Sequence, residues 1–245
     1  MKILVSIDDT DDLESRGTGE IAELIAAGII ANGWGSCGPV TRHQLLLHPD
    51  VPYTSHNSSM CFPAEISGEM LDTLTKYCCT TLAAESVPTS DPGLCVLVPE
   101  RLLQPEAIMD YGYRAKTAVI TKEEAYAIAA THGVHLSEHG GSGQGVIGAL
   151  AGAGLRLSGN DGRFKGRFWI PTDNGIATVR DIGRFGIEVV RTLEKQVLGE
   201  DEAVFVGAWV KPVLRDRKTV LLVTPADAGS GAAWKACDRR IFEDY

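Results

Sequence analysis

Hydrophobic positions along the first hundred residues follow two different periods. Residues 2–7 are mostly apolar and lead into an acidic run, which predicts a buried strand. Residues 20–32 and 69–85 carry apolar side chains at three- and four-residue spacing, which predicts amphipathic helices. Further strands are predicted at residues 40–48, 58–66 and 94–98. The order β-α-β-β-α-β is that of a ferredoxin-like arrangement.

The second half of the chain has a less regular pattern. Helices are expected at residues 106–111, 122–131, 146–155 and 182–197. Strands are expected at residues 134–137, 164–170, 203–210 and 219–223. The pattern predicts an α/β (α+β) fold of two domains that divide between residues 110 and 135, where no linker marks the boundary.

Composition narrows the class of protein. The 245 residues are 44% hydrophobic and 22% charged, which is typical of a globular chain with a sizeable core. No apolar run approaches a membrane span and the N-terminus lacks a secretory pattern, so we expect a cytoplasmic protein. The six scattered cysteines form no C-x-x-C pair, which disfavours zinc. A net charge of −9 disfavours a broad nucleic-acid surface.

The segment Ile7-Asp8-Asp9-Thr10-Asp11-Asp12 is the most informative candidate site. Four carboxylates at the end of a buried strand repel one another unless a cation lies among them. Their oxygens suit Mg²⁺, which commonly uses one or two carboxylates together with substrate phosphates. We predict that Asp8, Asp9 and Asp11 bind the metal. The alternative is a solvated acidic turn that caps the following helix.

Two polar segments accompany this acidic run. Arg16 and Gly17 lead to a helix start, where Thr18 or Gly19 is the expected N-cap and backbone amides can bind phosphate. The polar stretch around residues 48–59 joins two predicted strands. We select Arg42, His48 and Asn57 as candidate substrate contacts, although loop polarity alone also explains such a segment.

The third candidate is a glycine-rich run. Gly143, Gly145 and Gly148 match G-x-G-x-x-G before an apolar helix, and such glycines let backbone amides approach phosphates. The strand before them is weak and the run lies mid-chain, which disfavours a dinucleotide-binding fold. We therefore predict phosphate contacts from Gly143, Gln144 and Gly145, with tight helix packing as the alternative.

Three segments in the same order resemble the tRNA-isoleucine 2-agmatinylcytidine synthetase family. Ile-Asp-Asp-Thr-Asp followed by Ser-Arg-Gly is matched by residues 7–11 and 15–17. The family's Arg-Leu-Asn-Pro-x-x-Pro-Trp-Lys-Thr-x-Gly-Asn segment is similar to residues 47–57. Its Gly-x-Gly-Leu/Val-Ile-Gly-Ala-Leu-Ala segment is similar to residues 143–151, and the likeness spans residues 1–225.

The resemblance implies an ATP- and Mg²⁺-dependent phosphotransferase. A kinase-like domain would occupy residues 1–115 and a ferredoxin-like domain residues 116–245. In the family a cytosine carbonyl is phosphorylated so that agmatine displaces the phosphate, and a threonine near the first helix is itself phosphorylated. Thr18 is the nearest threonine here, whereas counting from Ser-Arg-Gly favours Glu20. The family's OB-fold and zinc ribbon, which hold tRNA, have no counterpart in this sequence, so a substrate smaller than tRNA is expected.

These observations lead to three hypotheses. The first is an ATP/Mg²⁺-dependent phosphotransferase or ligase-like enzyme that acts on a small molecule or nucleoside. Its catalytic residues would be Asp8, Asp9, Asp11 and Thr18, and Arg16, Gly17 and the glycine loop would contact phosphates. The second is a metal-dependent phosphatase resembling haloacid dehalogenases, with Asp9 as nucleophile. The third is a nucleotide-binding module without activity. The sequence indicates no oligomeric state.

Overall fold

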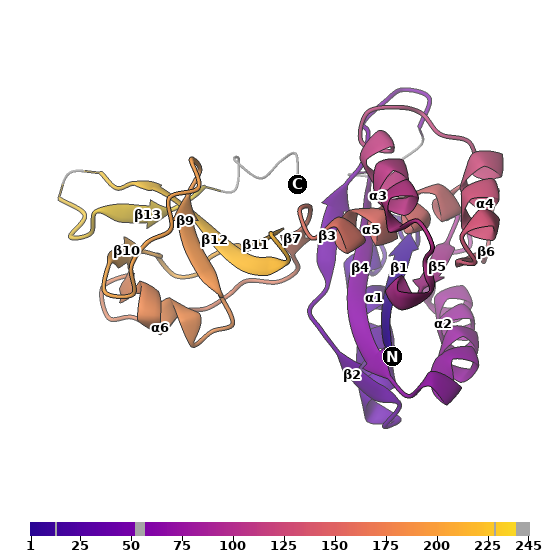
Figure 1. The fold of residues 1–245 in the computed structure, drawn as a ribbon, viewed down its shortest axis with the longest axis horizontal. Helices are drawn as coiled ribbons and strands as arrows, with labels where there is room; N and C mark the ends of the chain where they lie inside the picture. The colour runs from indigo at the N-terminus through magenta and orange to yellow at the C-terminus, as the bar shows by residue number, and fades with distance from the viewer. Residues whose placement is uncertain (13, 52–56, 228, 239–245) are drawn as a thin grey trace. The chain divides into compact units, whose positions relative to one another are not determined.

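The chain folds into two compact units, Met1–Ser158 and Gly159–Tyr245. The computed structural model describes residues 1–12, 14–51, 57–227 and 229–238 (Figure 1). The division lies beyond residue 158 rather than near residue 115, because the glycine-rich run and the helix after it pack against the N-terminal sheet.

The first unit is built on an antiparallel sheet. Its strands are β1 (Lys2–Asp8), β2 (Gly35–Cys37), β3 (Thr41–Gln44), β4 (Ser58–Ile66), β5 (Gly93–Leu97) and β6 (His135–Glu138). β1 lies between β4 and β5, and β6 extends the sheet beyond β5. β2 and β3 follow one another along the other edge of β4. The short strand β2 was not predicted. With β2 and β3 taken as two pieces of one edge strand, the first hundred residues have the predicted ferredoxin-like β-α-β-β-α-β order.

Helices cover both faces of this sheet, as Figure 1 shows. They are α1 (Thr18–Ala31), α2 (Leu71–Glu85), α3 (Pro105–Arg114), α4 (Lys122–Thr131) and α5 (Gly145–Ser158), with short 3₁₀ turns at Gly68–Met70 and Pro99–Arg101. Successive side chains of a strand point to opposite faces. Ile3, Val5 and Ile7 accordingly pack in the core under α1 and α2, whereas Leu4 packs in the core under α3, α4 and α5.

Helix α5 approaches the sheet closely because glycines face its neighbours. A Cβ on Gly148 would lie 1.7 Å from Asp8 Oδ2, and one on Gly152 would lie 2.3 Å from Ser59 Oγ. On another side, a Cβ on Gly154 would lie 2.1 Å from a backbone oxygen of α3. The glycines of this segment thus serve helix packing, and they bring the start of α5 against the end of β1.

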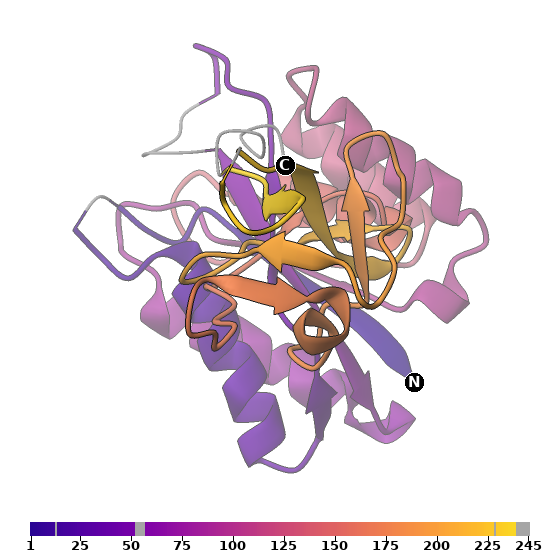
Figure 2. The ribbon, with the colours of Figure 1, turned by 90° about the vertical axis from the view of Figure 1, so that its left-hand side faces the viewer.

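The second unit is mostly β-structure (Figure 2). Its elements are β7 (Arg163–Phe164), β8 (Ile176–Thr178), α6 (Val179–Gly183), β9 (Val189–Thr192), β10 (Ala203–Phe205), β11 (Val213–Arg215), β12 (Lys218–Pro225) and β13 (Trp234–Ala236). β12 pairs with β11 and β13 antiparallel and with β9 parallel. The ferredoxin-like arrangement expected for residues 116–245 is not present in the described part of this unit.

The prediction of a helix at residues 182–197 is wrong. Only residues 182–183 are helical, as the end of α6, and turns and strand β9 follow; the side chains of β9 alternate between half-buried and buried positions. Gly186 has φ +80°, so it interrupts any helical run from α6. The apolar residues of the segment recur at a spacing that fits either structure, and pairing with β12 decides between them.

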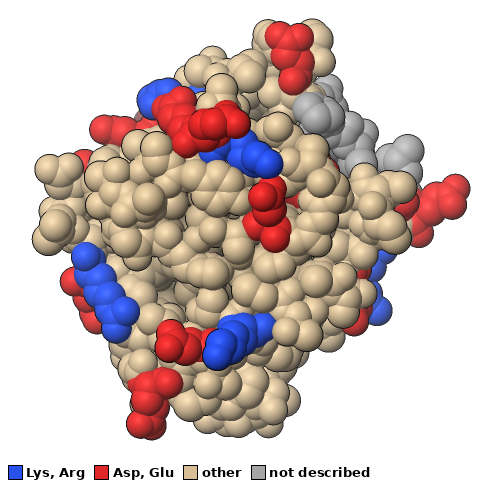
Figure 3. All heavy atoms as spheres, turned by 90° about the vertical axis from the view of Figure 1, so that its right-hand side faces the viewer, with Lys and Arg blue, Asp and Glu red and all other residues tan. Residues whose placement is uncertain are grey.

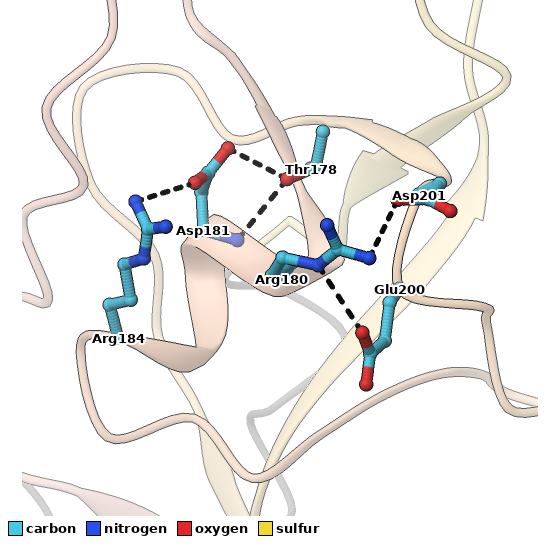
Figure 4. Close-up of polar contacts among 6 residues, drawn as sticks. All are labelled: Thr178, Arg180, Asp181, Arg184, Glu200 and Asp201. Carbon is cyan, nitrogen blue, oxygen red and sulfur yellow. Dashed lines mark hydrogen bonds and ion pairs between the residues drawn. The ribbon is translucent and has the colours of Figure 1, made fainter.

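Helix α6 is short and is fixed by polar contacts at its start (Figure 4). The Thr178 hydroxyl accepts a hydrogen bond from Asp181 N at 3.2 Å and donates to Asp181 Oδ2 at 2.7 Å. Arg184 pairs with Asp181, while Arg180 reaches Glu200 and Asp201. Hydrogen bonding from the N-cap residue Thr178 lowers the pKa of Asp181 in the first turn.

The structure bears on the state of the cysteines and on membrane-spanning helices. All six cysteines lie in the described residues and are free thiols. No helix among the described residues is long and apolar enough to cross a membrane.

Candidate active site

A cleft of about 420 Å³ opens in the first unit where β1 ends. Its acidic wall comes from the β1–α1 connection and its opposite side from the start of α5. The lining residues used below are Asp8, Asp9, Asp11, Thr18, Asp50, Asn57, Ser58, Ser142, Gln144 and Gly145. An apolar wall of leucine, isoleucine, valine and alanine side chains completes it.

Three carboxylates are crowded at the end of β1. Asp8 is buried and points to the α5 side of the sheet, where Gly148 leaves room for it. Burial, with the neighbouring charges of Asp9 and Asp11, raises the pKa of Asp8 well above its ordinary value. Burial and the charges of Asp91 and Asp11 raise the pKa of Asp9 to about 6. Of the described residues that line the cleft, none is Lys, Arg or His. This site therefore favours a cation.

Thr18 begins helix α1 with its hydroxyl in the cleft. Gly17 is the N-cap, in place of the expected Thr18 or Gly19. The Thr18 hydroxyl instead donates to Asp11 Oδ1 at 2.6 Å and accepts from the Thr10 hydroxyl at 3.0 Å. Glu20, the other candidate for the family threonine position, is exposed and does not line the cleft. Thr18 is thus the residue whose oxygen is held beside a carboxylate.

The glycine-rich run is tied to the acidic wall through Asp91. The Ser142 amide and hydroxyl both donate to the Asp91 carboxylate, and the Gly145 amide donates to the Asp91 carbonyl at 3.0 Å. The Asp91 amide in turn donates to Asp9. Gln144, an exposed residue, lies next to this anchor just before α5, and its backbone amide donates to no described backbone carbonyl. Amides at a helix start attract anions.

The candidate substrate residues are only partly brought together. Asn57 lines the cleft and donates from Nδ2 to the Leu46 carbonyl at 2.7 Å. Arg42 Nε donates a hydrogen bond to Ser58 Oγ at 2.9 Å, and His48 Nδ1 lies 3.7 Å from Asp50 Oδ2. Ser58 and Asp50 line the cleft, whereas Arg42 and His48 are not among its lining residues. Residues 52–56 of the motif lie outside the described residues.

Of the residues predicted to contact phosphate, some line the cleft and others do not. Gln144 and Gly145 line the cleft. Gly143, with φ +77°, packs against Glu138 instead. Arg16 forms an exposed ion pair with Glu85 at 2.9 Å, and Gly17 caps α1.

Sequence reasoning missed Asp50, Ser58, Asp91 and Ser142. Asp91 carried a usable signal, because a strand antiparallel to β1 must start where β1 ends, and Gly93 of β5 is paired with Asp8. The polar turn that precedes β5 therefore had to lie beside the acidic run.

The oxygen ligands of the cleft decide whether it suits a metal ion. Among the described residues, no three Asp, Glu, His or Cys side chains are arranged so that together they could hold a metal ion. Mg²⁺ needs only one or two carboxylates and takes its remaining ligands from water and phosphate. The hard oxygens of Asp8, Asp9 and Asp11, which all line the cleft, fit that requirement. A broad cationic surface is absent from the face shown in Figure 3, where Lys and Arg stand singly beside Asp or Glu.

Comparison with known proteins identifies a structural likeness. No family model and no curated protein matches the sequence. Apo TiaS, an agmatidine synthetase that acts on an isoleucine tRNA, is similar over 63% of this chain and 35% of its own, with 22% identity and a TM-score of 0.53. The complex of TiaS with that tRNA and ATP is 23% identical over 63% of this chain and 36% of its own, with a TM-score of 0.55. A tRNA fluorescent labeling enzyme is 23% identical over 63% of this chain and 36% of its own, with a TM-score of 0.54.

These proteins are matched over little more than a third of their length. The share of this chain that is covered corresponds in size to the first unit. At such identities the match concerns the fold. The resemblance inferred from the three sequence segments is confirmed at that level: this chain has the mixed α/β fold of a part of TiaS.

Proposed function

We propose that the chain is an ATP-dependent phosphotransferase or ligase-like enzyme whose nucleotide binds in the cleft of the first unit. The observation that carries the proposal is the placement of the Asp8–Asp9–Asp11 cluster against the start of α5, with Asp91 joining the two. One side offers oxygen ligands for a cation and the other offers a helix start for an anion. This pair of environments suits a metal-bound polyphosphate. A solved TiaS complex contains ATP, which agrees with that assignment.

In this proposal Asp8, Asp9 and Asp11 hold Mg²⁺, and the Gln144 and Gly145 backbone contacts phosphate. When bound, the metal neutralises the charge of the phosphates, which the cleft's own side chains cannot do because none of its described lining residues is cationic. Asp91 acts as a positioning residue, since it ties the loop to the end of β1.

Thr18 is proposed as an acceptor of the phosphoryl group. Its hydroxyl lies 2.6 Å from Asp11 Oδ1, which is within reach for a general base. In the transfer, the bond from γ-phosphorus to the bridging oxygen of ATP breaks, ADP leaves, a bond from phosphorus to Thr18 Oγ1 forms, and the hydroxyl proton passes to Asp11. Mass spectrometry after incubation with ATP tests this step. Thr18→Val must abolish the modification, and Thr18→Ser must restore it.

The second substrate is proposed to be an amine or a nucleoside. The acidic lining, including Asp50, suits an amine, and a solved TiaS complex contains agmatine. Within the described residues the Asn57 Oδ1 accepts no hydrogen bond, so it is available to an N–H group. The apolar wall fits a base or an alkyl chain. A substrate smaller than tRNA remains our proposal.

Calorimetric titration with a nonhydrolysable ATP analogue tests the nucleotide assignment. We expect saturable binding that requires Mg²⁺ and that is lost in Asp9→Asn. Asp12→Asn is the matched control, because Asp12 is in the same loop but is exposed. Absence of binding at millimolar analogue would refute the proposal. Phosphate release without ATP would favour the phosphatase, and binding without turnover of any amine or nucleoside would favour the non-enzymatic module.

A further inference from the structure

A second, smaller cavity lies in the second unit. It has a volume of about 280 Å³ and is lined by Asn160, Arg191, Leu193, Lys195, Arg215, Asp216 and Leu222. Three of these side chains are cationic and one is acidic. The cavity is thus opposite in charge to the cleft of the first unit, and the proposed function does not use it.

Two turns with unusual backbone conformations form its rim. Lys195 has φ +71° in a turn closed by hydrogen bonds from Lys195 N to Thr192 O and from Thr192 N to Gln196 O. Asp216 and Arg217 have φ +52° and +61° in the two-residue connection of β11 and β12. Glycine or asparagine is usual at such positions. Lys195 thus lines the cavity from a backbone conformation that strains a non-glycine residue.

Among the described residues, one cation of the cavity lacks an acidic partner and another lacks a hydrogen-bond acceptor at one nitrogen. The Arg191 side chain is only 12% exposed and forms an ion pair with Asp216 Oδ2 at 2.6 Å. Its Nε is buried and has no hydrogen-bond partner among the described residues. Lys195 is exposed and has no acidic partner in the described part of the chain. A buried guanidinium N–H without an acceptor is costly unless a ligand supplies one.

We propose that this cavity binds a phosphate group. The guanidinium of Arg191 offers a planar donor edge, and Lys195 adds a mobile point charge, a combination that suits the several oxygens of a phosphate. Asp216 holds the Arg191 guanidinium at the wall of the cavity through Nη1. The charge distribution along the chain agrees, since the acidic excess lies in residues 1–158 and residues 159–245 are nearly balanced.

Titration of the full chain in EDTA tests the proposal, because without a metal the acidic cleft repels anions. The probes are inorganic phosphate, followed by calorimetry, and a fluorescent single-stranded oligonucleotide, followed by anisotropy. Lys195→Asn keeps the turn conformation and removes the charge. Arg184→Ala is the control, since Arg184 is an exposed arginine of the same unit that pairs with Asp181.

We expect Lys195→Asn to weaken binding at least tenfold and Arg184→Ala to leave it unchanged. Loss of phosphate binding would assign the site to a phosphate monoester or free phosphate. Loss of oligonucleotide binding alone would assign it to a phosphodiester. If neither probe binds the wild-type protein, or if both variants bind like it, the proposal is overturned. Because nucleotide binding in the cleft requires Mg²⁺ and is measured with Asp9→Asn, the two proposals fail separately.

Discussion

Replacing Asp9 by asparagine is expected to stabilise the metal-free protein at neutral pH. Burial and two neighbouring carboxylates raise the pKa of Asp9 to about 6 from 3.8. A shift of about 2 units corresponds to about 3 kcal/mol at 1.36 kcal/mol per unit. Asp9 is partly exposed, and solvent screening reduces this to about 1–2 kcal/mol. The φ of Asp9 is +51°, a conformation that asparagine also tolerates.

The sign of the pH dependence follows from the direction of the shift. The folded protein keeps a proton on Asp9 at pH values where the unfolded chain has lost it. The free energy of unfolding therefore falls as pH rises from about 4 through about 6, and above this window the cost of the charged group is fully present. Asp9→Asn removes that cost, so the variant gains over the wild type at pH 7.5 and gains little at pH 4.5.

Differential scanning calorimetry in EDTA measures the effect. At pH 7.5 we expect the melting temperature of Asp9→Asn to rise by roughly 2–8 °C. The control, Asp12→Asn, removes a carboxylate whose pKa is lowered by hydrogen bonds from Glu14 and Ser15, so it must not stabilise. Mg²⁺ should then stabilise the wild type more than Asp9→Asn. An unchanged or lower melting temperature for Asp9→Asn at pH 7.5 would show that charge crowding at the end of β1 is not a real cost.

The remaining predictions concern packing and contacts around the cleft. Gly148→Ala places a Cβ 1.7 Å from Asp8 Oδ2 and should lower the free energy of unfolding by at least about 2 kcal/mol. The control Gly183→Ala has open space around its Cβ and should change that free energy by less than about 1 kcal/mol. Denaturant titrations measure both. Thr18→Val loses the hydrogen bonds to Asp11 and Thr10 and should cost about 1–2 kcal/mol, and equal stability of Thr18→Val and wild type would contradict this network. Arg16→Ala breaks an exposed ion pair and should cost less than about 1 kcal/mol with unchanged affinity for the ATP analogue, so a tenfold loss of affinity would place Arg16 in the site.

Periodicity predicted the first unit better than the second for a physical reason. Residues 58–66 and 122–131 were placed with their observed bounds, because these elements are nine and ten residues long and show their period of burial over several repeats. In the second unit the strands are three or four residues long at several places and pair with segments distant in sequence. A pattern of four residues cannot distinguish β9 from a helical turn, so long-range pairing decides its structure.

The acidic residues of the candidate site were visible in the sequence because charge crowding after an apolar strand is a local signal. Arg16, Arg42 and His48 were selected on the same local ground, yet their side chains pair with Glu85, Ser58 and Asp50 at the surface or behind the cleft wall. A long cationic side chain has many accessible partners, and its choice depends on tertiary neighbours. Local polarity therefore identifies the loop but not the direction of its side chains.

Asp91 shows how topology could have supplied what local pattern did not. The predicted order β-α-β-β-α-β places the last strand antiparallel to the first, so the turn before the last strand must lie at the end of the first. The sequence Thr-Ser-Asp-Pro-Gly in that turn then puts a carboxylate beside Asp9. The same carboxylate anchors Ser142 of the glycine-rich run, although 51 residues separate them. One antiparallel pairing thus brings together the acidic wall of the cleft and the wall formed by the start of α5, and the cleft exists because the fold joins them there.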